Sequence, residues 1–452
     1  MSNFRLIDRD TGFLMPPSVD EWLPERHLAR FVVEVISTLD LRSMTGWYRG
    51  SGAASYHPQL LLGMIVYGYA TGVFSCRKLE RATFDSVAMR FVATNEHPDH
   101  DTIATFRRRF LPQIEALFVQ VLGLAREMGV LKLGTVALDG TKIHANASRH
   151  SALSYEHASK IEAQLQAEVA DLLARAEAAD QADLPDGMSI PAELARRETR
   201  LAAIAAAKAK IEARAKARHV DAKADYDAKL ARQEAKQAGG KKPGGKPLVV
   251  PTDAPKPTDQ VNLTDEDSRI MPVAGGGFEQ CYNAQAIVAA DSLLVLATDV
   301  VQAPNDKQQL APMLGKIAAL PDELGKVGTL LADNGYFSEG NVNACAAAGV
   351  DPVIAMGREA HHRTLDARFA AALPPPDNPT PLAGMAHRLT TPAGKKLYAL
   401  RKQIPEPVFG IIKSALGFRQ FLLRGLDKVR GEWSLVTMAW NIKRMFVLAG
   451  SN

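Results

Sequence analysis

Apolar positions in the first 130 residues recur at the spacing of amphipathic helices. The first such run, within residues 25–41, consists of Leu28, Phe31, Val32, Val35 and Ile36. Pro58 predicts the start of a second helix, Ser75 the N-cap of a third, and Asp101 the N-cap of a long fourth helix. The fourth helix should stop at Gly129, and Pro112 is a point where it could break. Residues 1–130 are therefore predicted to form an all-helical domain.

From Ser151 to Ala238 the sequence is rich in Ala, Glu, Lys, Arg and Gln and carries two apolar stripes at helical spacing. The stripes consist of Ile161, Leu165, Val169, Leu172 and Leu173, and of Leu194, Leu201, Ile204 and Ile211. They predict an antiparallel helical hairpin inserted into another fold. Its basic far end could lie along phosphates or form a solvated coiled-coil face. The Gly-, Pro- and Lys-rich residues 239–260 that follow predict a mobile linker.

Further along, the pattern changes to that of strands. Residues 280–290 and 293–301 are two extended apolar runs, and they predict a β-hairpin. Asn305 or Asp306 is then expected to cap a helix that continues to Leu320.

Residues 328–356 alternate strand, helix and strand patterns. Ser338 is placed to cap the helix and Gly349 to stop it, so this segment predicts a βαβ unit. Residues 358–396 show little periodicity and are expected to be irregular. A final helical region is predicted to begin near Pro407.

Composition narrows the class of protein without defining it. The 452 residues exceed one typical core, so two or three domains are expected. The formal net charge of +4 permits a nucleic-acid partner and does not require one. Cys76, Cys281 and Cys345 form no CxxC pair, which disfavours a disulfide framework or a cysteine zinc site. Without a signal-peptide pattern or an apolar run of about 20 residues, the protein is expected to be soluble, unexported and cytoplasmic.

Two acids stand out because each follows an apolar strand pattern. Asp139 follows the alternating residues from Thr135 and precedes Gly140, and Asp333 follows the apolar run that ends at Ala332. Asp-Gly between alternating apolar residues is also the commonest two-residue hairpin turn. The second strand of the same kind favours the alternative, in which two acids at strand ends form one metal site. In βαβ units such as the one predicted for residues 328–356, ligands collect at the carboxyl ends of the strands.

A third acid lies among cations in the last helical region. Glu406 precedes Pro407, and Lys413 lies seven residues later, so both are expected on one helix face. The surrounding cations are Arg401, Lys402, Arg419, Arg424, Lys428 and Arg430. Cations around an acid suit phosphodiester chemistry, because they hold the backbone and neutralise the charge of the leaving oxygen. A Glu at a helix start is also a common cap that compensates the helix dipole.

A second basic cluster lies in the predicted N-terminal domain. Arg107, Arg108 and Arg109 lie on the last helix there, and short capped helices joined by tight turns suit a helix-turn-helix-like DNA reader. A solvated arginine face is the alternative.

In several stretches the chain resembles bacterial DDE transposases of insertion sequences. Residues 56–80 and 98–110 are similar to the N-terminal domain of that family. LDGTKIHANAS resembles its first-acid strand, LADNGYFS its second, and EPVFGIIK with GFRQFLLRG its third-acid helix. The resemblance covers nearly the whole chain.

The resemblance implies a catalytic role for Asp139, Asp333 and Glu406, which in that family bind two divalent ions, Mg²⁺ or Mn²⁺. It also implies a Tyr, Arg, Glu, Lys signature, matched by Tyr398, Arg401, Glu406 and Lys413. Four residues separate Arg401 from Glu406, where the usual pattern has three, so Lys402 occupies the usual spacing. Arg401 is preferred, because a guanidinium grips two phosphate oxygens.

Other residues near these motifs have more open roles. Arg419 and Arg424 are expected to contact DNA. His144 could ligate or orient beside Asp139, and a solvated histidine is the alternative.

These features predict an RNase H-like mixed α/β sheet flanked by helices. An all-helical domain at 1–130 should precede it, 131–150 should begin the core, 151–260 should interrupt it with the hairpin and linker, and 261–452 should complete it. The implied function is a transposase that binds terminal inverted repeats in double-stranded DNA, cleaves and transfers strands. It is expected to act as a homodimer on DNA, at the nucleoid and without a membrane partner. An RNase H-like nuclease that does not join strands, and a domesticated DNA-binding protein, are the alternatives.

Overall fold

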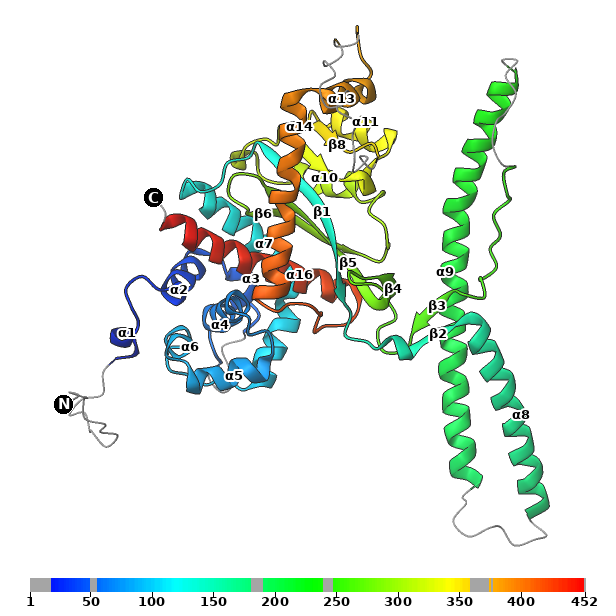
Figure 1. Cartoon of the computed structure of the whole chain (residues 1–452). Helices are drawn as coiled ribbons and strands as arrows, with labels where there is room; N and C mark the ends of the chain where they lie inside the picture. The colour runs from blue at the N-terminus through cyan, green and yellow to red at the C-terminus, as the bar shows by residue number, and fades with distance from the viewer. Residues whose placement is uncertain are drawn as a thin grey trace, which may run out of the picture. The chain divides into compact units, whose positions relative to one another are not determined.

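The computed structural model describes residues 18–48, 55–179, 190–238, 247–357, 374 and 377–450 (Figure 1). The chain forms two compact units, one comprising Met1–His144 with Tyr282–Asn452 and the other Ala145–Cys281. The four-part division expected from the sequence is finer than this and stays a prediction.

The N-terminal part of the first unit is helical, as predicted. Its helices are α1 (Val19–Trp22), α2 (Leu28–Thr38), α3 (Arg42–Thr45), α4 (Pro58–Thr71), α5 (Cys76–Asp85), α6 (Val87–Val92) and α7 (His100–Glu127). The pattern within residues 25–41 forms α2, and Pro58 occupies the first turn of α4. The predicted third helix is instead two helices, because the Ser86 hydroxyl accepts a hydrogen bond from the backbone N–H of Met89 and so begins α6.

The long helix α7 differs from the prediction at its start. Asp99, not Asp101, is its N-cap and accepts a hydrogen bond from the backbone N–H of Thr102 at 2.8 Å. Pro112 lies inside the helix without ending it, since buried side chains on both sides, including Phe110 and Ile114, hold the helix against its neighbours. Gly129 follows the end of α7 with φ of 72°.

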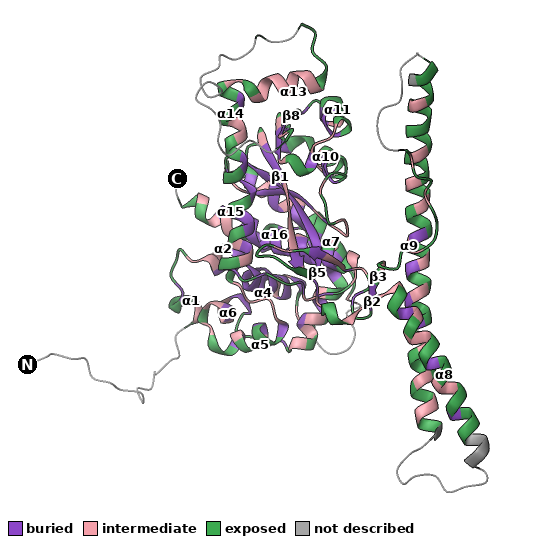
Figure 2. Cartoon of the chain, turned by 45° about the vertical axis from the view of Figure 1, so that its right-hand side comes forward, coloured by how far each residue is buried: buried purple, intermediate pink, exposed green. Residues whose placement is uncertain are grey.

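Helix α4 is buried along nearly its whole length (Figure 2). It packs against α2, α7 and the C-terminal helix α16 (Leu426–Ala449), so helices from both ends of the chain share one core. Among the described residues no single helix has the length and apolar character to cross a membrane. Only α4 and α5 taken together, bent by 94°, reach those limits.

A mixed sheet forms the rest of the first unit. Its strands lie in the order β6 (Val295–Val301), β5 (Phe278–Ala289), β1 (Thr135–His144), β7 (Thr329–Ala332) and β8 (Asp351–Ile354). In chain order this is 3-2-1-4-5, with the hairpin of β5 and β6 antiparallel and with β7 and β8 parallel to β1. Helices α10 (Leu310–Ala318) and α11 (Glu339–Ala347) and the short helices η2 (Asp322–Leu324) and η3 (Asn334–Tyr336) complete the region. The predicted RNase H-like core is confirmed.

The predicted hairpin and βαβ unit are both present in this sheet. Ser338 caps α11 by accepting a hydrogen bond from the Asn341 backbone N–H, and Gly349 follows α11 with φ of 68°. The cap expected for α10, Asn305 or Asp306, is wrong, because Gln309 precedes α10 and Asp306 lies before it in a turn. The Asp306 side chain has a different role, described below.

The segment between the sheet and α16 is more helical than predicted. It contains α13 (Pro381–Thr390), α14 (Pro392–Ala399), η4 (Leu400–Gln403), α15 (Pro405–Gly410) and the π-helical turn η5 (Ile411–Ala415). Thr380 and Thr391 cap α13 and α14, and a proline follows each cap, so Thr-Pro starts both helices. The prediction of irregular structure is wrong for residues 381–396, and residues 358–373, 375 and 376 lie outside the described chain. Helix α15 begins two residues before Pro407.

The second unit contains the predicted helical hairpin, α8 (Tyr155–Ala179) and α9 (Ile190–Ala238). Beside it lie η1 (Arg149–Ser151), the antiparallel strands β2 (Ala152–Ser154) and β3 (Gln260–Asn262), and β4 (Arg269–Pro272), which pairs with the start of β5. A small core joins the helices and strands and consists of Leu153, Ala158, Leu165, Ile204, Ala207, Ile211 and Val261. The described residues of the predicted linker, 247–259, form no helix or strand, and the predicted mobility is not tested.

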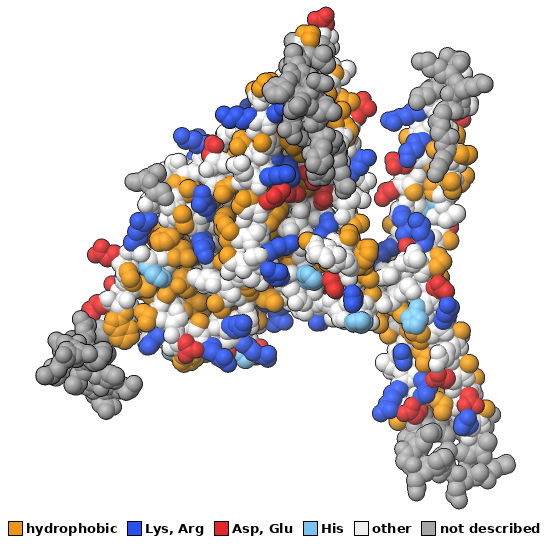
Figure 3. Space-filling view, viewed as in Figure 1, with side chains coloured by type: hydrophobic (Ala, Val, Ile, Leu, Met, Phe, Trp, Pro, Cys, Tyr) orange, Lys and Arg blue, Asp and Glu red, His pale blue; other side chains and the backbone are white. Residues whose placement is uncertain are grey.

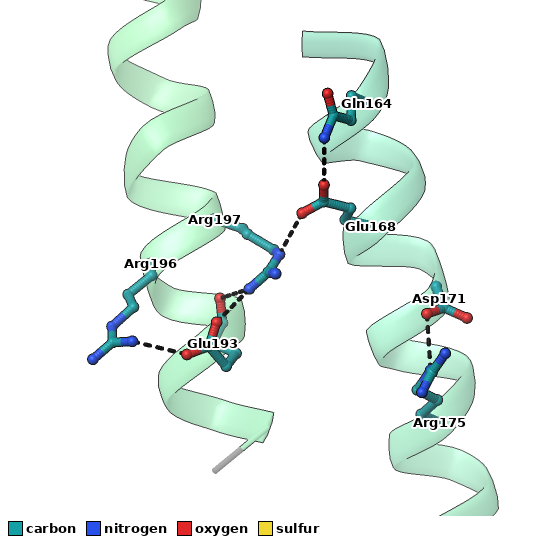
Figure 4. A network of polar contacts seen from close by, with 7 residues as sticks. All are labelled: Gln164, Glu168, Asp171, Arg175, Glu193, Arg196 and Arg197. Carbon is teal, nitrogen blue, oxygen red and sulfur yellow. Dashed lines mark hydrogen bonds and ion pairs between the residues drawn. The ribbon is translucent and has the colours of Figure 1, made fainter. Parts of the chain in front are cut away.

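Charges of both signs cover the hairpin (Figure 3). Arg197 of α9 pairs with Glu168 of α8 at 2.8 Å and also contacts Glu193 on its own helix (Figure 4). Lys208 pairs with Glu162 at 2.6 Å. These pairs join the two helices beside their apolar stripe. The two alternatives for the basic far end of the hairpin stay predictions.

Candidate active site

The register of the sheet brings the first two predicted acids together. Thr135 pairs with Thr329 and Ala137 with Leu331. Asp139 lies two residues beyond Ala137, and Asp333 lies two residues beyond Leu331, so the same offset sets the two acids side by side. Asp139 was predicted to lie at the end of its strand. This position is wrong, because β1 continues to His144 along β5. It lies where β1 loses its partner β7, so the hairpin turn is excluded.

Gly140 leaves room for polar side chains beside Asp139. A Cβ atom on Gly140 would lie 2.7 Å from Oδ1 of Asp306 and 2.9 Å from Oδ1 of Asn283, and still closer to Nε2 of Gln285. Any larger residue would therefore displace these groups.

Asp139 is largely enclosed, with its side chain 17% exposed. Burial raises its pKa to about 7, and the carboxylates of Asp333 and Asp306 add to the rise. The Gly140 backbone N–H, 2.8 Å from Oδ1, and the Arg401 guanidinium act in the opposite direction. Because its charged form is disfavoured by burial and by neighbouring carboxylates, the Asp139 carboxylate would be stabilised by any cation that binds beside it.

Arg401 lies between the first and third predicted acids. Its Nη1 is 3.5 Å from Oδ2 of Asp139, and its Nη2 donates to Oε1 of Glu406 at 3.1 Å. The Arg401 side chain is 10% exposed, whereas Lys402 is exposed. Thus Arg401, in spite of its unusual spacing, is the cation that joins β1 to α15.

Lys413 reaches the same strand from the π-helical turn. Its Nζ donates to Oγ1 of Thr141 at 2.7 Å, and Thr141 lies two residues after Asp139 and hence on the same face of β1. Glu406 and Lys413 were expected on one face of a regular helix. The helix is not regular there, because Lys413 lies within the wider π-helical turn that follows α15, and the shared face stays a prediction.

A fourth carboxylate, Asp306, lies beside these residues and was missed from the sequence. Its Oδ1 accepts hydrogen bonds from Asn283 Nδ2 at 2.7 Å and Gln285 Nε2 at 2.8 Å. The hydroxyl of Tyr336 donates to the other end of the Gln285 amide. Asn283 and Gln285 alternate along the buried strand β5, and this period of two polar residues is the signal that could have revealed the network.

The donor set fits hard divalent cations. Asp139, Asp333 and Glu406 offer only carboxylate oxygens, which Mg²⁺ and Mn²⁺ prefer, and Arg401 already supplies positive charge between two of them. Within the described chain, however, no three Asp, Glu, His or Cys side chains lie close enough to hold one ion as they stand. Metal binding would therefore require Arg401 or Glu406 to shift.

The remaining predicted DNA contacts of the C-terminal region differ in exposure. Arg419 and Arg424 are exposed, and Arg419 donates to the Lys413 carbonyl at 3.1 Å. Tyr398 is half-buried on α14. His144 pairs through its backbone with Arg419 and Phe421, so it fastens the end of β1 to this segment.

The predicted arginine cluster of α7 is divided. Arg107 is enclosed, and its Nη1 donates to the Tyr69 hydroxyl at 2.8 Å, near the buried Glu432 carboxylate. A DNA-contacting role for Arg107 is therefore wrong, since its guanidinium serves the core. Arg108 and Arg109 are exposed, and Arg109 lies over the Trp47 ring at 5.9 Å.

The fold and the carboxylate cluster define a class, the RNase H-like phosphoryl-transfer enzymes. Residues 260–442 match the family model described as a transposase DDE domain, and residues 17–109 match the model described as a transposase domain, DUF772. The chain belongs to the insertion-sequence transposases that combine these two domains. The first match includes Asp333 and Glu406 and begins after Asp139. No curated protein and no solved structure showed significant similarity to the chain.

Proposed function

We propose that this transposase binds the terminal inverted repeats of its own insertion sequence, cleaves there and joins the freed ends to target DNA. The observation that carries the proposal is that Asp139 lies beside Asp333 on neighbouring strands and shares Arg401 with Glu406. Strand β1, the end of strand β7 and helix α15 each contribute one acid. This arrangement favours chemistry at a phosphodiester over simple DNA binding, which needs no enclosed carboxylates.

Asp139, Asp333 and Glu406 would hold two divalent ions, Mg²⁺ or Mn²⁺. Such ions, when bound, activate the attacking oxygen and stabilise the leaving oxygen. Lys413 is placed beside Thr141 to hold the phosphate next to the scissile bond, and Arg419 and Arg424 extend the cationic surface toward the flanking backbone. Asp306 fixes Gln285 and Asn283, which line the floor beside Gly140.

The test is incubation of the full-length protein with DNA carrying the element's ends and Mg²⁺, with products separated on a sequencing gel. We expect cleaved and joined strands from the natural protein and neither from Asp139→Asn or Asp333→Asn, because an amide lacks the charge that holds the metal. Both variants should still bind the ends within a few-fold of the natural protein. Cleavage by either variant would contradict the assignment.

The same gel separates the rival functions. An RNase H-like nuclease would give nicked strands and no joined product. A domesticated DNA-binding protein would bind the ends and give neither.

We further propose that the protein acts at the nucleoid, where its DNA substrate lies, and assembles as a homodimer on paired ends. Each end needs one active site, and a symmetric pair of protomers supplies two. Light scattering of the complex with end DNA should give two protomers per pair of ends, and a single protomer holding both ends would contradict the dimer.

A further inference from the structure

The junction of α4 and α5 has the geometry of a helix-turn-helix. The two helices meet at 94°, and four residues, Gly72 to Ser75, connect them. Helix-turn-helix pairs cross at about 90–120° through a turn of three or four residues that often contains glycine. Gly72 has φ of 86°, and a Cβ atom there would lie 2.8 Å from the Leu416 carbonyl oxygen. The turn is thus held against the end of η5.

Helix α5 presents two contrasting faces. Cys76, Leu79 and Thr83, at helical spacing, are buried against α6 and α7. On the opposite face Arg77, Lys78, Arg81 and Phe84 are exposed. Figure 3 shows cationic side chains along the lower edge of the helical region, where Figure 1 labels α5.

The cations of α5 are not occupied by acids. Within the described residues, Arg77, Lys78 and Arg81 form no ion pair and no side-chain hydrogen bond. Glu80, one of the two acids on the helix, accepts hydrogen bonds from Nδ1 and the backbone N–H of His100, at 2.8 and 3.2 Å. Its charge is therefore directed toward the start of α7. The exposed cations complement the negative charge of a nucleic acid.

The exposed aromatic residue adds a second kind of contact. Phe84 is 58% exposed, yet its ring is held in place by stacking on His97, with centroids 3.9 Å apart. It lies seven residues after Arg77 and three after Arg81, on the same face of α5. A fixed, exposed apolar ring beside arginines suits contact with a thymine methyl group in the major groove.

We propose that α5 is the recognition helix of this transposase and that Arg77, Lys78 and Arg81 read base edges in the major groove of the terminal repeat. This rests on the proposed binding of terminal repeats and names the element that performs it. In helix-turn-helix proteins the N-terminal residues of the second helix contact the bases, and Arg77 and Lys78 lie in the first turn of α5. Arginine pairs with guanine through two hydrogen bonds. The proposal moves sequence reading from α7 to α5.

The experiment is selection of duplexes from a random pool by full-length natural protein and by Arg77→Ala, Lys78→Ala and Arg81→Ala, followed by affinity measurement on the selected site. Lys132→Ala, at an exposed cation outside the helix-turn-helix, is the matched control. Thermal unfolding should be unchanged in all four variants, because each residue is exposed. We expect Arg77→Ala or Arg81→Ala to lose about 5- to 150-fold of the preference for one base position.

Three results would overturn the proposal in distinguishable ways. Equal weakening on selected and random duplexes would mean that α5 touches only phosphates. Unchanged preferences in all α5 variants, together with lost preference in Arg108→Ala or Arg109→Ala, would assign sequence reading to α7. Failure of the natural protein to enrich any sequence would refute the proposed end binding itself.

Discussion

Replacing Asp139 by Asn should abolish activity and, at the same time, stabilise the metal-free protein. The carboxyl is 17% exposed, and burial together with Asp333 and Asp306 raises its pKa from 3.8 to about 7. A raised pKa means that the charged form is disfavoured in the folded state. The contribution of Asp139 to stability is therefore fully present below about pH 3.8 and is lost as pH rises through about 7.

The magnitude follows from the same values. A pKa difference of about 3 corresponds to about 4 kcal/mol, since each pKa unit is about 1.4 kcal/mol. Asn removes the disfavoured charge, and the weaker contact with Arg401 offsets part of the gain. We expect the variant to exceed the natural protein by about 2–4 kcal/mol in free energy of unfolding above pH 7.

The assay is urea denaturation in EDTA at pH 4.5, 6 and 8. The advantage of Asp139→Asn should be small at pH 4.5, grow toward pH 7 and then level off. Asp333→Asn is the matched control, because an Asn at this helix cap can still accept from the Gly335 backbone N–H, so its stability should change little. An Asp139→Asn protein that is no more stable at pH 8 than at pH 4.5, relative to the natural protein, would refute the reasoning.

Three further predictions concern other parts of the chain. Arg401→Ala should cost about 2 kcal/mol in urea denaturation, because it leaves Asp139 without its cationic partner. It should also slow strand transfer on every end sequence, as should Lys413→Ala. Lys402→Ala should change stability by less than about 0.5 kcal/mol, and equal effects at 401 and 402 would contradict the assignment of Arg401. Gly140→Ala should cost about 1–3 kcal/mol of folding stability through crowding and reduce cleavage. Gly123→Ala, where a Cβ meets nothing within 4 Å, should be neutral or stabilising by thermal unfolding. A larger loss of stability in Gly123→Ala than in Gly140→Ala would exclude crowding. His27 caps α2 by accepting a hydrogen bond from the Ala29 backbone N–H, and burial, with Arg30, lowers the pKa of His27 below 6.5. The stability that the neutral cap contributes is therefore present above about pH 6.5 and lost as pH falls through the folded pKa. His27→Asn should cap α2 without that pH dependence in a pH series of thermal unfolding, and a dependence that persists would assign it to another group.

Several elements of the fold were predicted correctly because their determinants are local. The alternation around β1 and β7, the Ser338 cap and the Gly349 stop each depend on a few neighbouring residues. The Thr-Pro starts of α13 and α14 were also local, and the weak apolar periodicity of residues 381–396 concealed them.

Features that depend on distant residues could not be predicted in this way. Arg107 looks like its exposed neighbours in sequence, and only its contact with Tyr69 near Glu432 turns its guanidinium toward the core. Asp306 looks like a helix cap until Asn283 and Gln285 bind it. The π turn that contains Lys413 likewise has no local sequence signal.

The central claim is that Asp139, Asp333 and Glu406 bind the catalytic ions together. Anomalous diffraction from crystals of the full-length protein with Mn²⁺ and end DNA tests it most directly. We predict two peaks, each about 2.0–2.2 Å from carboxylate oxygens drawn from these three residues, with Arg401 displaced from between Asp139 and Glu406. Peaks on other side chains, or ordered Mn²⁺ that leaves any one of the three acids without a metal contact, would contradict the claim.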